Sequence, residues 1–239
     1  SLYSNTNNET KIELAVKSFT TTNSDEIEIL KYIKNQNIDC NLINAKIIEM
    51  KTEMETKTVI IMERMDGDLY KIKKHIKHNE MLNIVYNIAK ICLCLNIYGL
   101  SYTDLKPENI LYKCLEDNKI KIVLGDIGSI CRKDNVHKIV STYEPPEGNV
   151  CNEKAMVYGI GATAMQLNNT DSNDTQYEQY ELLLEQMIHR KSSSRFTLQQ
   201  IIDFLDNLQL KEAAAKENTE TGPAAKATKP ATPTTANTA

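Results

Sequence analysis

The spacing of hydrophobic and polar residues predicts strands and one helix near the start of the chain. Apolar and polar positions alternate over residues 11–19, as they do in a half-buried strand. Residues 25–35 place apolar side chains three and four positions apart, which predicts a helix. Residues 42–50 and 56–63 are typical of two more strands, and the charged turn 51–55 should join them into a hairpin.

The rest of the chain is predicted to be mostly helical. The expected helices are a short Lys-rich one at 69–76, two apolar ones at 81–98 and 153–166, and two amphipathic ones at 177–189 and 198–208. The apolar pair is hydrophobic almost all round, which indicates burial, and Gly159, Gly161 and Ala162 should let the second of them pack closely. Residues 110–112 and 120–124 predict another hairpin. The expected fold class is therefore α+β.

Composition fits a globular protein and favours neither nucleic acid nor a membrane as a partner. The chain has 239 residues, of which 41% are hydrophobic, so it can bury a sizeable core. A net charge of −4 gives no general attraction to nucleic acid or acidic membranes, and neither is expected as a partner. We expect no membrane span, because no apolar run reaches the roughly 18 residues needed. From Lys211 the composition shifts to Ala, Thr, Lys and Pro, so 211–239 should be a disordered tail or an artificial linker.

The cysteines show no metal-binding pattern. They are Cys40, Cys92, Cys94, Cys114, Cys131 and Cys151. None forms a C-x-x-C pair, and none has a metal-like spacing to a histidine. Cys92 and Cys94 lie two apart in a helical pattern, so they point to different sides and should not pair with each other. We expect reduced, mostly buried thiols and hence a cytoplasmic or nuclear protein.

One stretch, Gly99–Tyr112, brings three different polar groups together. Asp104, Lys106 and Asn109 place a carboxylate, an ammonium group and a carboxamide within six residues, which indicates a site. The alternative is a surface turn, since Asp, Lys, Pro and Asn are common turn residues.

The segment D-L-K-P-E-N, residues 104–109, resembles the catalytic loop of eukaryotic-type protein kinases, whose usual form is H-R-D-L-K-x-x-N. Tyr102 and Thr103 stand where the family has His and Arg. The resemblance implies that Asp104 and Lys106 are catalytic and that Asn109 binds the metal. The D-L-K-P-E-N form also favours Ser or Thr over Tyr as acceptor.

A second match follows the predicted hairpin. D-I-G, which begins at Asp126, resembles the kinase D-F-G motif with Ile127 in place of Phe. The resemblance makes Asp126 the second magnesium ligand, and Gly128 should permit the backbone to turn away from the metal. The alternative is an ordinary D-x-G turn after a hairpin.

The N-terminal elements carry two further matches. A-V-K resembles the kinase strand whose Lys holds the nucleotide phosphates, which makes Lys17 that residue. Glu26 is followed by Ile29 and Leu30 in the family's E-x-x-[IL]-L pattern, so it should pair with Lys17. Glu28 is the second choice.

The segment V-I-I-M-E-R-M-D-G, residues 59–67, resembles the strand and hinge that join the two kinase lobes. Met62 would be the residue beside the adenine, and the backbone from Glu63 to Met65 would hydrogen-bond its edge. An ordinary edge strand is the alternative.

A structural match lies near the end of the folded region. Pro145-Pro146-Glu147 resembles the family's A-P-E, and the resemblance implies a buried salt bridge from Glu147 to Arg195. Thr197 is a good N-cap for the last helix, with Gln200 three residues on.

The departures from the family pattern fall around the proposed nucleotide site. No G-x-G-x-x-G occurs, which should weaken nucleotide binding, although Ser1–Tyr3 resembles the residues just after such a loop. Thr103 replaces an Arg that reads activation-segment phosphate, unless Arg132 or Lys133 substitutes. Lys154 stands where the family has an Asp that supports the catalytic loop.

A local basic patch is also present. Its residues are Lys71, Lys73, Lys74 and Lys77. A solvated helix face is the preferred interpretation, and contact with an acidic substrate is the alternative.

The resemblance as a whole implies a two-lobed fold, with residues 1–65 as the N-lobe and hinge and 66–210 as the C-lobe. It implies a Ser/Thr protein kinase that uses Mg²⁺ and ATP, acts on a protein substrate and is a candidate for an activating or regulatory protein partner. The alternative is a pseudokinase that acts as a binding module. A small-molecule kinase is disfavoured by Lys106 and by Pro145-Pro146-Glu147. The Asn, Lys and Ile bias and the compact size are reminiscent of kinases from large DNA viruses.

Overall fold

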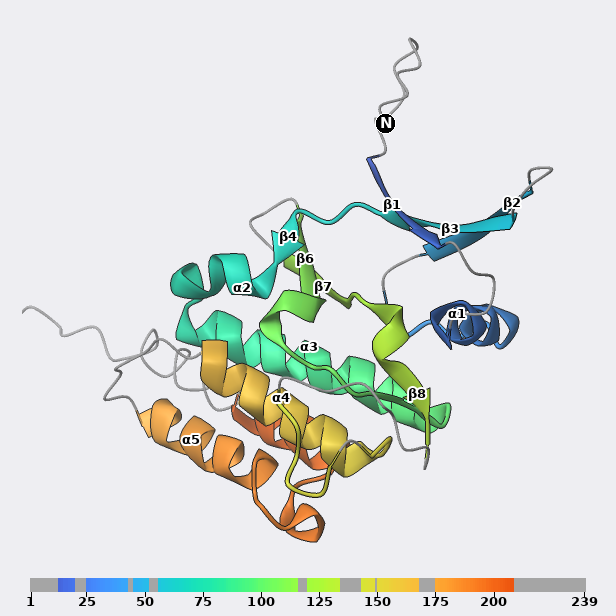
Figure 1. The fold of residues 1–239 in the computed structure, drawn as a ribbon. Helices are drawn as coiled ribbons and strands as arrows, with labels where there is room; N and C mark the ends of the chain where they lie inside the picture. Colours follow the sequence, from blue (N-terminus) through green and yellow to red (C-terminus); the bar gives the residue numbers. More distant parts are fainter. Residues whose placement is uncertain are drawn as a thin grey trace, which may run out of the picture. The chain divides into compact units, whose positions relative to one another are not determined.

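The computed structural model in Figure 1 describes residues 13–19, 25–42, 45–51, 56–115, 120–133, 143–148, 150–167 and 175–208. The features predicted for Ser1–Tyr3 and for the 211–239 tail lie outside these residues, as does most of the 51–55 turn. The protein is mixed helix and sheet, compatible with the expected α+β class.

The first sheet has the strand order β1-β3-β2 and is antiparallel throughout. Its strands are β1 (Leu14–Phe19), β2 (Ala45–Lys51) and β3 (Thr56–Glu63). The predicted hairpin of the second and third strands is confirmed, with Ala45 opposite Met62 and Lys51 opposite Thr56.

Strand β1 does not bury the apolar side that its alternation marks out. Leu14 and Val16 are 55% and 62% exposed, whereas the neighbouring Lys17 is partly covered. The side of the strand that carries Lys17 faces α1 instead, and Lys17 makes an ion pair with Glu26 of that helix.

Helix α1 (Asp25–Asn35) has the predicted bounds. Its first turn is acidic and its last turn carries Lys34, which suits the helix dipole. The helix buries Ile27, Ile29 and Leu30 together with Glu26, and it packs against the 3-10 turn η4 (Ile127–Ser129). A helix in the N-terminal part of the chain thus contacts the D-I-G segment.

Two smaller sheets follow. One has the order β4-β6-β7, and the other pairs β5 with β8. Their strands are β4 (Gly67–Asp68), β5 (Leu100–Tyr102), β6 (Ile110–Cys114), β7 (Ile120–Leu124) and β8 (Ile130–Arg132). The β6–β7 hairpin is confirmed. The sequence pattern missed β4, β5 and β8 because strands of two or three residues are too short to show alternation.

The remaining elements are helical. They are α2 (Leu69–Ile72), η1 (Lys73–His75), α3 (His78–Ile97), η2 (Pro107–Asn109), α4 (Glu153–Leu167), α5 (Thr175–Met187), η5 (Ser192–Ser194) and a last helix over 198–208. Helix α4 packs against both α3 and α5. A Cβ on Gly161 would lie 2.8 Å from Met187 and Ile188, and one on Gly159 would lie 3.1 Å from Leu105. The predicted close packing of this helix is therefore confirmed for both glycines.

Helix α3 contradicts the expectation that no apolar run is long enough to span a membrane. The window Glu80–Ile97 spans 18 residues with a mean hydropathy of 1.3, so by length and composition alone it could cross a membrane. Half of that window is buried inside the protein. The core helix of a globular fold has the same properties, so the window is weak evidence for a span.

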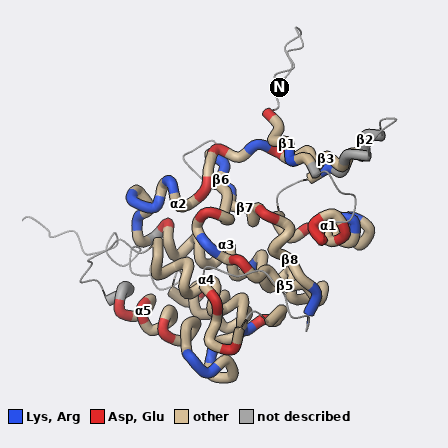
Figure 2. The backbone as a smooth tube through the Cα atoms, viewed as in Figure 1, with Lys and Arg blue, Asp and Glu red and all other residues tan. Residues whose placement is uncertain are grey.

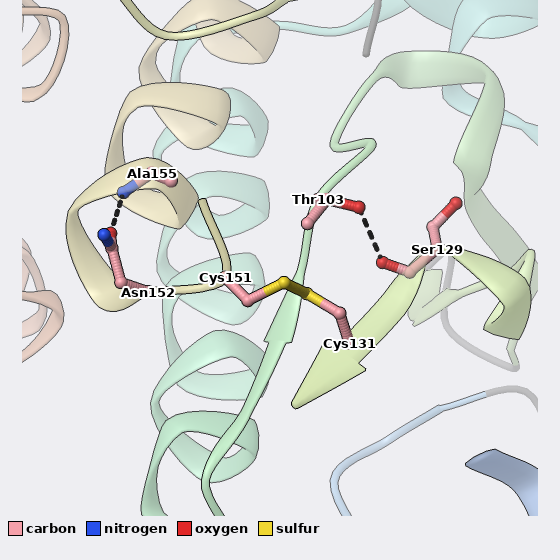
Figure 3. The surroundings of a disulfide bond; sticks show 6 residues. All are labelled: Thr103, Ser129, Cys131, Cys151, Asn152 and Ala155. Atoms are coloured by element: carbon pink, nitrogen blue, oxygen red, sulfur yellow. Dashed lines mark hydrogen bonds between the residues drawn. A yellow bond between two sulfur atoms is a disulfide. The ribbon is translucent and has the colours of Figure 1, made fainter. Parts of the chain in front are cut away.

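The prediction of reduced cysteines is wrong for four of them. Cys40 pairs with Cys94 and Cys131 pairs with Cys151, with Cα–Cα separations of 5.5 and 6.0 Å. Figure 3 shows the second bond. Local spacing could not reveal these pairs, because the partners lie 54 and 20 residues apart and meet only through the fold. Cys92 and Cys114 are free, and burial raises the pKa of the Cys92 thiol.

The basic patch lies at α2 and η1, where Figure 2 shows Lys residues gathered. Lys71, Lys74 and Lys77 are exposed. Lys71 lies 3.0 Å from Asp68, and the ammonium group of Lys73 lies 4.0 Å from the centre of the Tyr70 ring. The exposure fits the preferred interpretation of a solvated face.

Candidate active site

The D-L-K-P-E-N segment folds into a loop closed by its own polar side chains. Asp104 is only 5% exposed. Its carboxylate lies 2.6 Å from the ammonium group of Lys106. Asn109 donates from Nδ2 to both the backbone oxygen and Oδ2 of Asp104, at 2.9 Å each. The structure thus brings together the three residues predicted for the catalytic loop.

Asp126 lies in a tight turn directly beside that loop. The amide of Gly125 donates to the backbone oxygen of Asn109 at 2.9 Å, which makes Asn109 and Asp126 neighbours. A Cβ at position 125 would come within 2.9 Å of the end of the Leu111 side chain, so a larger residue there would have to displace Leu111. Asp126 has a φ of 36°, in the left-handed region that costs a non-glycine residue of order 1–3 kcal/mol.

The expected role of Gly128 is not the one the structure shows. The left-handed backbone conformation in this turn belongs to Asp126 and not to Gly128. Gly128 instead lies against Glu26, whose Oε2 would be 3.4 Å from an added Cβ. An added Cβ would thus make ordinary van der Waals contact with Glu26.

Lys17 joins α1 to the Asp126 turn. Its ammonium group lies 2.6 Å from Glu26 and 3.7 Å from Oδ1 of Asp126. Glu26 is mostly buried, with an 11% exposed side chain, whereas Glu28 is exposed. Glu26, and not Glu28, is thus the residue that pairs with Lys17.

Two residues that depart from the kinase pattern hydrogen-bond to the Asp126 turn. They are Tyr102 and Thr103, and their acceptors precede and follow Asp126 in the chain. The buried hydroxyl of Tyr102 donates to the backbone oxygen of Gly125 at 2.8 Å. Thr103 donates to the backbone oxygen of Ser129 twice at 2.9 Å, from its amide and from its hydroxyl. Ser129 in turn donates from Oγ to Asp126 at 2.9 Å.

The ionisation of Tyr102 suits this role. Burial chiefly, and then the charges of Asp126 and Asp104, raise its pKa well above the ordinary value, so the phenol keeps its proton and remains a donor. From the sequence, Tyr102 and Thr103 depart from the kinase pattern together with Lys154, which suggests a rebuilt support for the loop. Their contacts could not be found from the sequence, since both acceptors are backbone oxygens.

The three predicted hinge residues lie at the end of β3 and just beyond it. Met62 and Glu63 are the last residues of β3, and Met65 follows within the segment that leads to β4. The carboxylate of Glu63 lies 2.5 Å from Lys113 on β6, and this hydrogen bond lowers the pKa of Glu63 and raises that of Lys113. The end of β3 is thus fastened to β6, the strand that follows Asn109.

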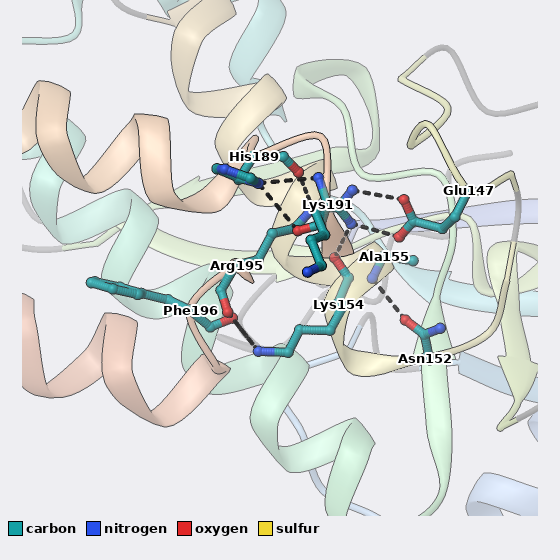
Figure 4. Close-up of polar contacts among 8 residues, drawn as sticks. All are labelled: Glu147, Asn152, Lys154, Ala155, His189, Lys191, Arg195 and Phe196. Carbon is teal, nitrogen blue, oxygen red and sulfur yellow. Dashed lines mark hydrogen bonds and ion pairs between the residues drawn. The ribbon is translucent and has the colours of Figure 1, made fainter. Parts of the chain in front are cut away.

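The predicted ion pair between Glu147 and Arg195 is present (Figure 4). Two hydrogen bonds of 2.6 and 2.7 Å join the guanidinium group to both carboxylate oxygens. Lys154 donates to the backbone oxygens of Arg195 and Phe196, at 2.6 and 3.1 Å, while Arg195 donates to the backbone oxygen of Lys154 at 2.8 Å. Lys154 therefore braces Arg195.

The start of the last helix follows the predicted pattern. The Thr197 hydroxyl accepts from the amide of Gln200 at 3.1 Å, and the Gln200 side chain accepts from the Thr197 amide at 2.8 Å. This is a reciprocal capping box.

The donor set fits magnesium held jointly with phosphates. Among the described residues, no three His, Cys, Asp or Glu side chains gather into a metal cluster. Mg²⁺ in phosphoryl-transfer sites usually takes one or two protein oxygens, with phosphates and water as the other ligands. Asp126 offers a carboxylate, and Asn109, which donates through its nitrogen, offers its amide oxygen.

Comparison with known proteins relates part of the chain to kinases. No family model matches. Over 126 residues the chain is 30% identical to "Probable serine/threonine-protein kinase fhkA" of Dictyostelium discoideum, covering 51% of this chain and 20% of that protein. Over 110 residues it is 33% identical to "Serine/threonine-protein kinase DCLK2" of Mus musculus, covering 44% of this chain and 13% of that protein.

The human protein of the same name gives the same figures as the mouse one. The chain is related to serine/threonine protein kinases over about half of its length. It spans a fifth or less of the length of these curated relatives.

Proposed function

We propose that this chain binds Mg-ATP and transfers the γ-phosphoryl group to a Ser or Thr hydroxyl of a protein substrate. The proposal is supported above all by one observation. Contacts of 2.6 to 3.7 Å link Glu26, Lys17 and Asp126, and the Asn109–Gly125 hydrogen bond links that set to Asp104 and Lys106. The partial relationship to Ser/Thr kinases favours the same activity.

Each side chain has a role in this mechanism. Asp104 orients the substrate hydroxyl and accepts its proton, and Lys106, close beside it, neutralises charge on the phosphoryl group. Lys17, held by Glu26, binds the α- and β-phosphates. Asn109 and Asp126 would hold magnesium, which when bound neutralises phosphate charge.

The proposal also includes an adenine-binding segment and a two-lobed architecture. The backbone from Glu63 to Met65 would bind the edge of the adenine beside Met62. Residues 1–65 and 66–210 would form the two lobes, with the nucleotide between them. We also propose a cytoplasmic or nuclear location, because ATP is abundant there.

A pseudokinase is the second candidate function. It is favoured by the altered Tyr102-Thr103 pair. Such a protein would bind a partner, with or without nucleotide, and would not transfer phosphate.

The deciding experiment compares the wild type with Asp104→Asn in magnesium, labelled ATP and a basic protein substrate. We expect the variant to lose about 10²–10⁴-fold in rate, the usual effect of a general base. Thermal melting should show that it remains folded. Equal labelling by both proteins would exclude the proposed kinase activity. Nucleotide binding without labelling would favour the pseudokinase.

A further inference from the structure

The disulfide between Cys131 and Cys151 joins two parts of the proposed machinery. Cys131 lies in β8, two residues after Ser129, which holds the Asp126 carboxylate. Cys151 lies just before α4 and four residues after Glu147, the partner of Arg195. Both cysteines are buried, with 3% and 0% exposure.

The surroundings of each cysteine are well ordered. On one side, β8 pairs with β5, and Cys131 lies opposite Ser101. On the other side, Asn152 accepts a 2.8 Å hydrogen bond from the amide of Ala155 and so caps α4. The bond thus links two hydrogen-bonded structures, one leading to Asp104 and one carrying the Glu147 anchor.

Residues before Cys151 are joined to the catalytic loop through α4. The hydroxyl of Tyr143 is hydrogen-bonded to Gln166 on α4. A Cβ on Gly159 of the same helix would lie 3.1 Å from Leu105, the residue after Asp104. Burial and the nearby charge of Glu108 raise the pKa of Tyr143. A shift of residues 143–148 would therefore act through α4 on the loop that carries Asp104.

The residues around Cys131 also make non-covalent contacts. Thr103 donates to the backbone oxygen of Ser129. The guanidinium carbon of Arg132 lies 4.7 Å from the centre of the Tyr32 ring on α1. To these contacts the disulfide adds a covalent tie from β8 to Cys151.

We propose that the Cys131–Cys151 bond positions the segment carrying Glu147 for the protein substrate, and that its reduction weakens substrate binding. This inference rests on the proposed kinase function. In the proposed cytoplasmic or nuclear location a disulfide is usually transient or redox-sensing. Because both cysteines are buried, a reductant reaches the bond only through local opening of the chain.

The redox step is a thiol–disulfide exchange. A dithiol reductant gives up two electrons and two protons, the sulfur–sulfur bond breaks, and Cys131 and Cys151 become thiols while the reductant becomes a disulfide. An oxidised small-molecule disulfide reverses the step and leaves as two thiols.

The other disulfide provides a matched control. Cys40, which follows α1, is bonded to Cys94 on α3, and neither residue lies in β8 or in the Glu147 segment. Removing this bond with Cys40→Ser and Cys94→Ser should leave the proposed switch intact.

The test begins by counting thiols. Protein treated with oxidised glutathione should carry two alkylatable thiols after denaturation, Cys92 and Cys114, and protein treated with dithiothreitol should carry all six. The KM values for a protein substrate and for ATP are then measured in both states. Reduction should raise the KM for the protein about fivefold or more and change that for ATP less than about twofold, and reoxidation should restore both.

The variants separate the two bonds. Cys131→Ser with Cys151→Ser should behave like reduced wild type in every buffer, and the Cys40/Cys94 variant should keep its redox response. An unchanged KM for the protein substrate in reduced wild type would overturn the inference, even if the Cys131/Cys151 variant fails to fold.

Hydrogen exchange tests the same bond without any enzyme assay. Reduction should speed exchange of the amides of Ser129 and Gly148, which are hydrogen-bonded to Asp126 and Pro145. Equal exchange in both redox states would overturn the inference. If oxidised wild type and Asp104→Asn label substrate equally, the proposed function fails, and exchange alone then decides the role of the disulfide.

Discussion

Arg195 holds Glu147 through a two-pronged ion pair, although the two residues lie 48 positions apart in the chain. The Arg195 side chain is fully buried, and that of Glu147 is 24% exposed. A buried guanidinium group needs such a partner, because an unpaired charge away from water is costly.

The first prediction concerns this pair. Glu147→Ala should lower the free energy of unfolding by about 3 kcal/mol, the lower end of the range for a buried pair, because Glu147 is partly exposed. Urea unfolding measures the change. Glu144→Ala, at an exposed neighbouring position, should change it by less than about 0.5 kcal/mol. Similar losses in both variants would mean that the ion pair contributes little.

The second prediction concerns the partner of Lys17. Glu26→Gln should weaken ATP binding, because Lys17 loses the carboxylate 2.6 Å away that holds its ammonium group. Removing such a charged hydrogen bond should cost about 1.5–3 kcal/mol, roughly 10- to 100-fold in Kd. Calorimetric titration with Mg-ATP measures the change.

The control for that prediction is Glu28→Gln, which changes an exposed carboxylate on the same turn of α1. Its affinity for ATP should match that of the wild type. A larger loss in Glu28→Gln than in Glu26→Gln would reverse the assignment.

The third prediction concerns Tyr102. Tyr102→Phe removes only the hydroxyl that donates to Gly125, leaving a buried carbonyl oxygen without this donor at the turn that carries Asp126. Stability should fall by about 1–2 kcal/mol. The Mg²⁺ concentration for half-maximal phosphoryl transfer should also rise, since Asp126 is held less firmly.

Magnesium dependence distinguishes a positioning role from a merely structural one. Tyr102→His, which installs the usual family residue, should recover part of the magnesium response. Tyr98→Phe, at a 43% exposed position, should change neither property. A normal magnesium requirement in a destabilised Tyr102→Phe variant would leave Tyr102 with a structural role alone.

The fourth prediction concerns pH and the hinge. The hydrogen bond from Lys113 lowers the pKa of Glu63 below its ordinary value of 4.5, so folding favours the charged carboxylate. The resulting stabilisation is present above pH 4.5 and is lost as the pH falls through the lower folded-state pKa. It should be small, because solvent screens the pair.

Melting temperatures across pH reveal this contribution. The wild type should exceed Glu63→Gln near neutral pH, and the difference should shrink on acidification below pH 4.5. Glu178→Gln, at an exposed position on α5, should show no such convergence. A gap of constant size at every pH would exclude the Glu63 charge as its cause.

The sequence alone determined the regular elements and several pairings. Helix α1 and strands β3 and β7 begin and end where the pattern of apolar residues places them, because repeats of several residues record which face is buried. The Lys17–Glu26 and Glu147–Arg195 contacts followed from motif resemblance, since these motifs fix both the residue type and its place in the order.

Only the tertiary structure decided which other residues meet. It paired Cys131 with Cys151, placed Tyr102 and Thr103 against backbone oxygens, and turned Leu14 and Val16 outward. Backbone acceptors leave no trace in the side-chain pattern, and a disulfide between distant cysteines depends on how the chain folds. The physical reason is the same in each case: a contact between residues far apart in sequence is specified by packing, which no local repeat encodes.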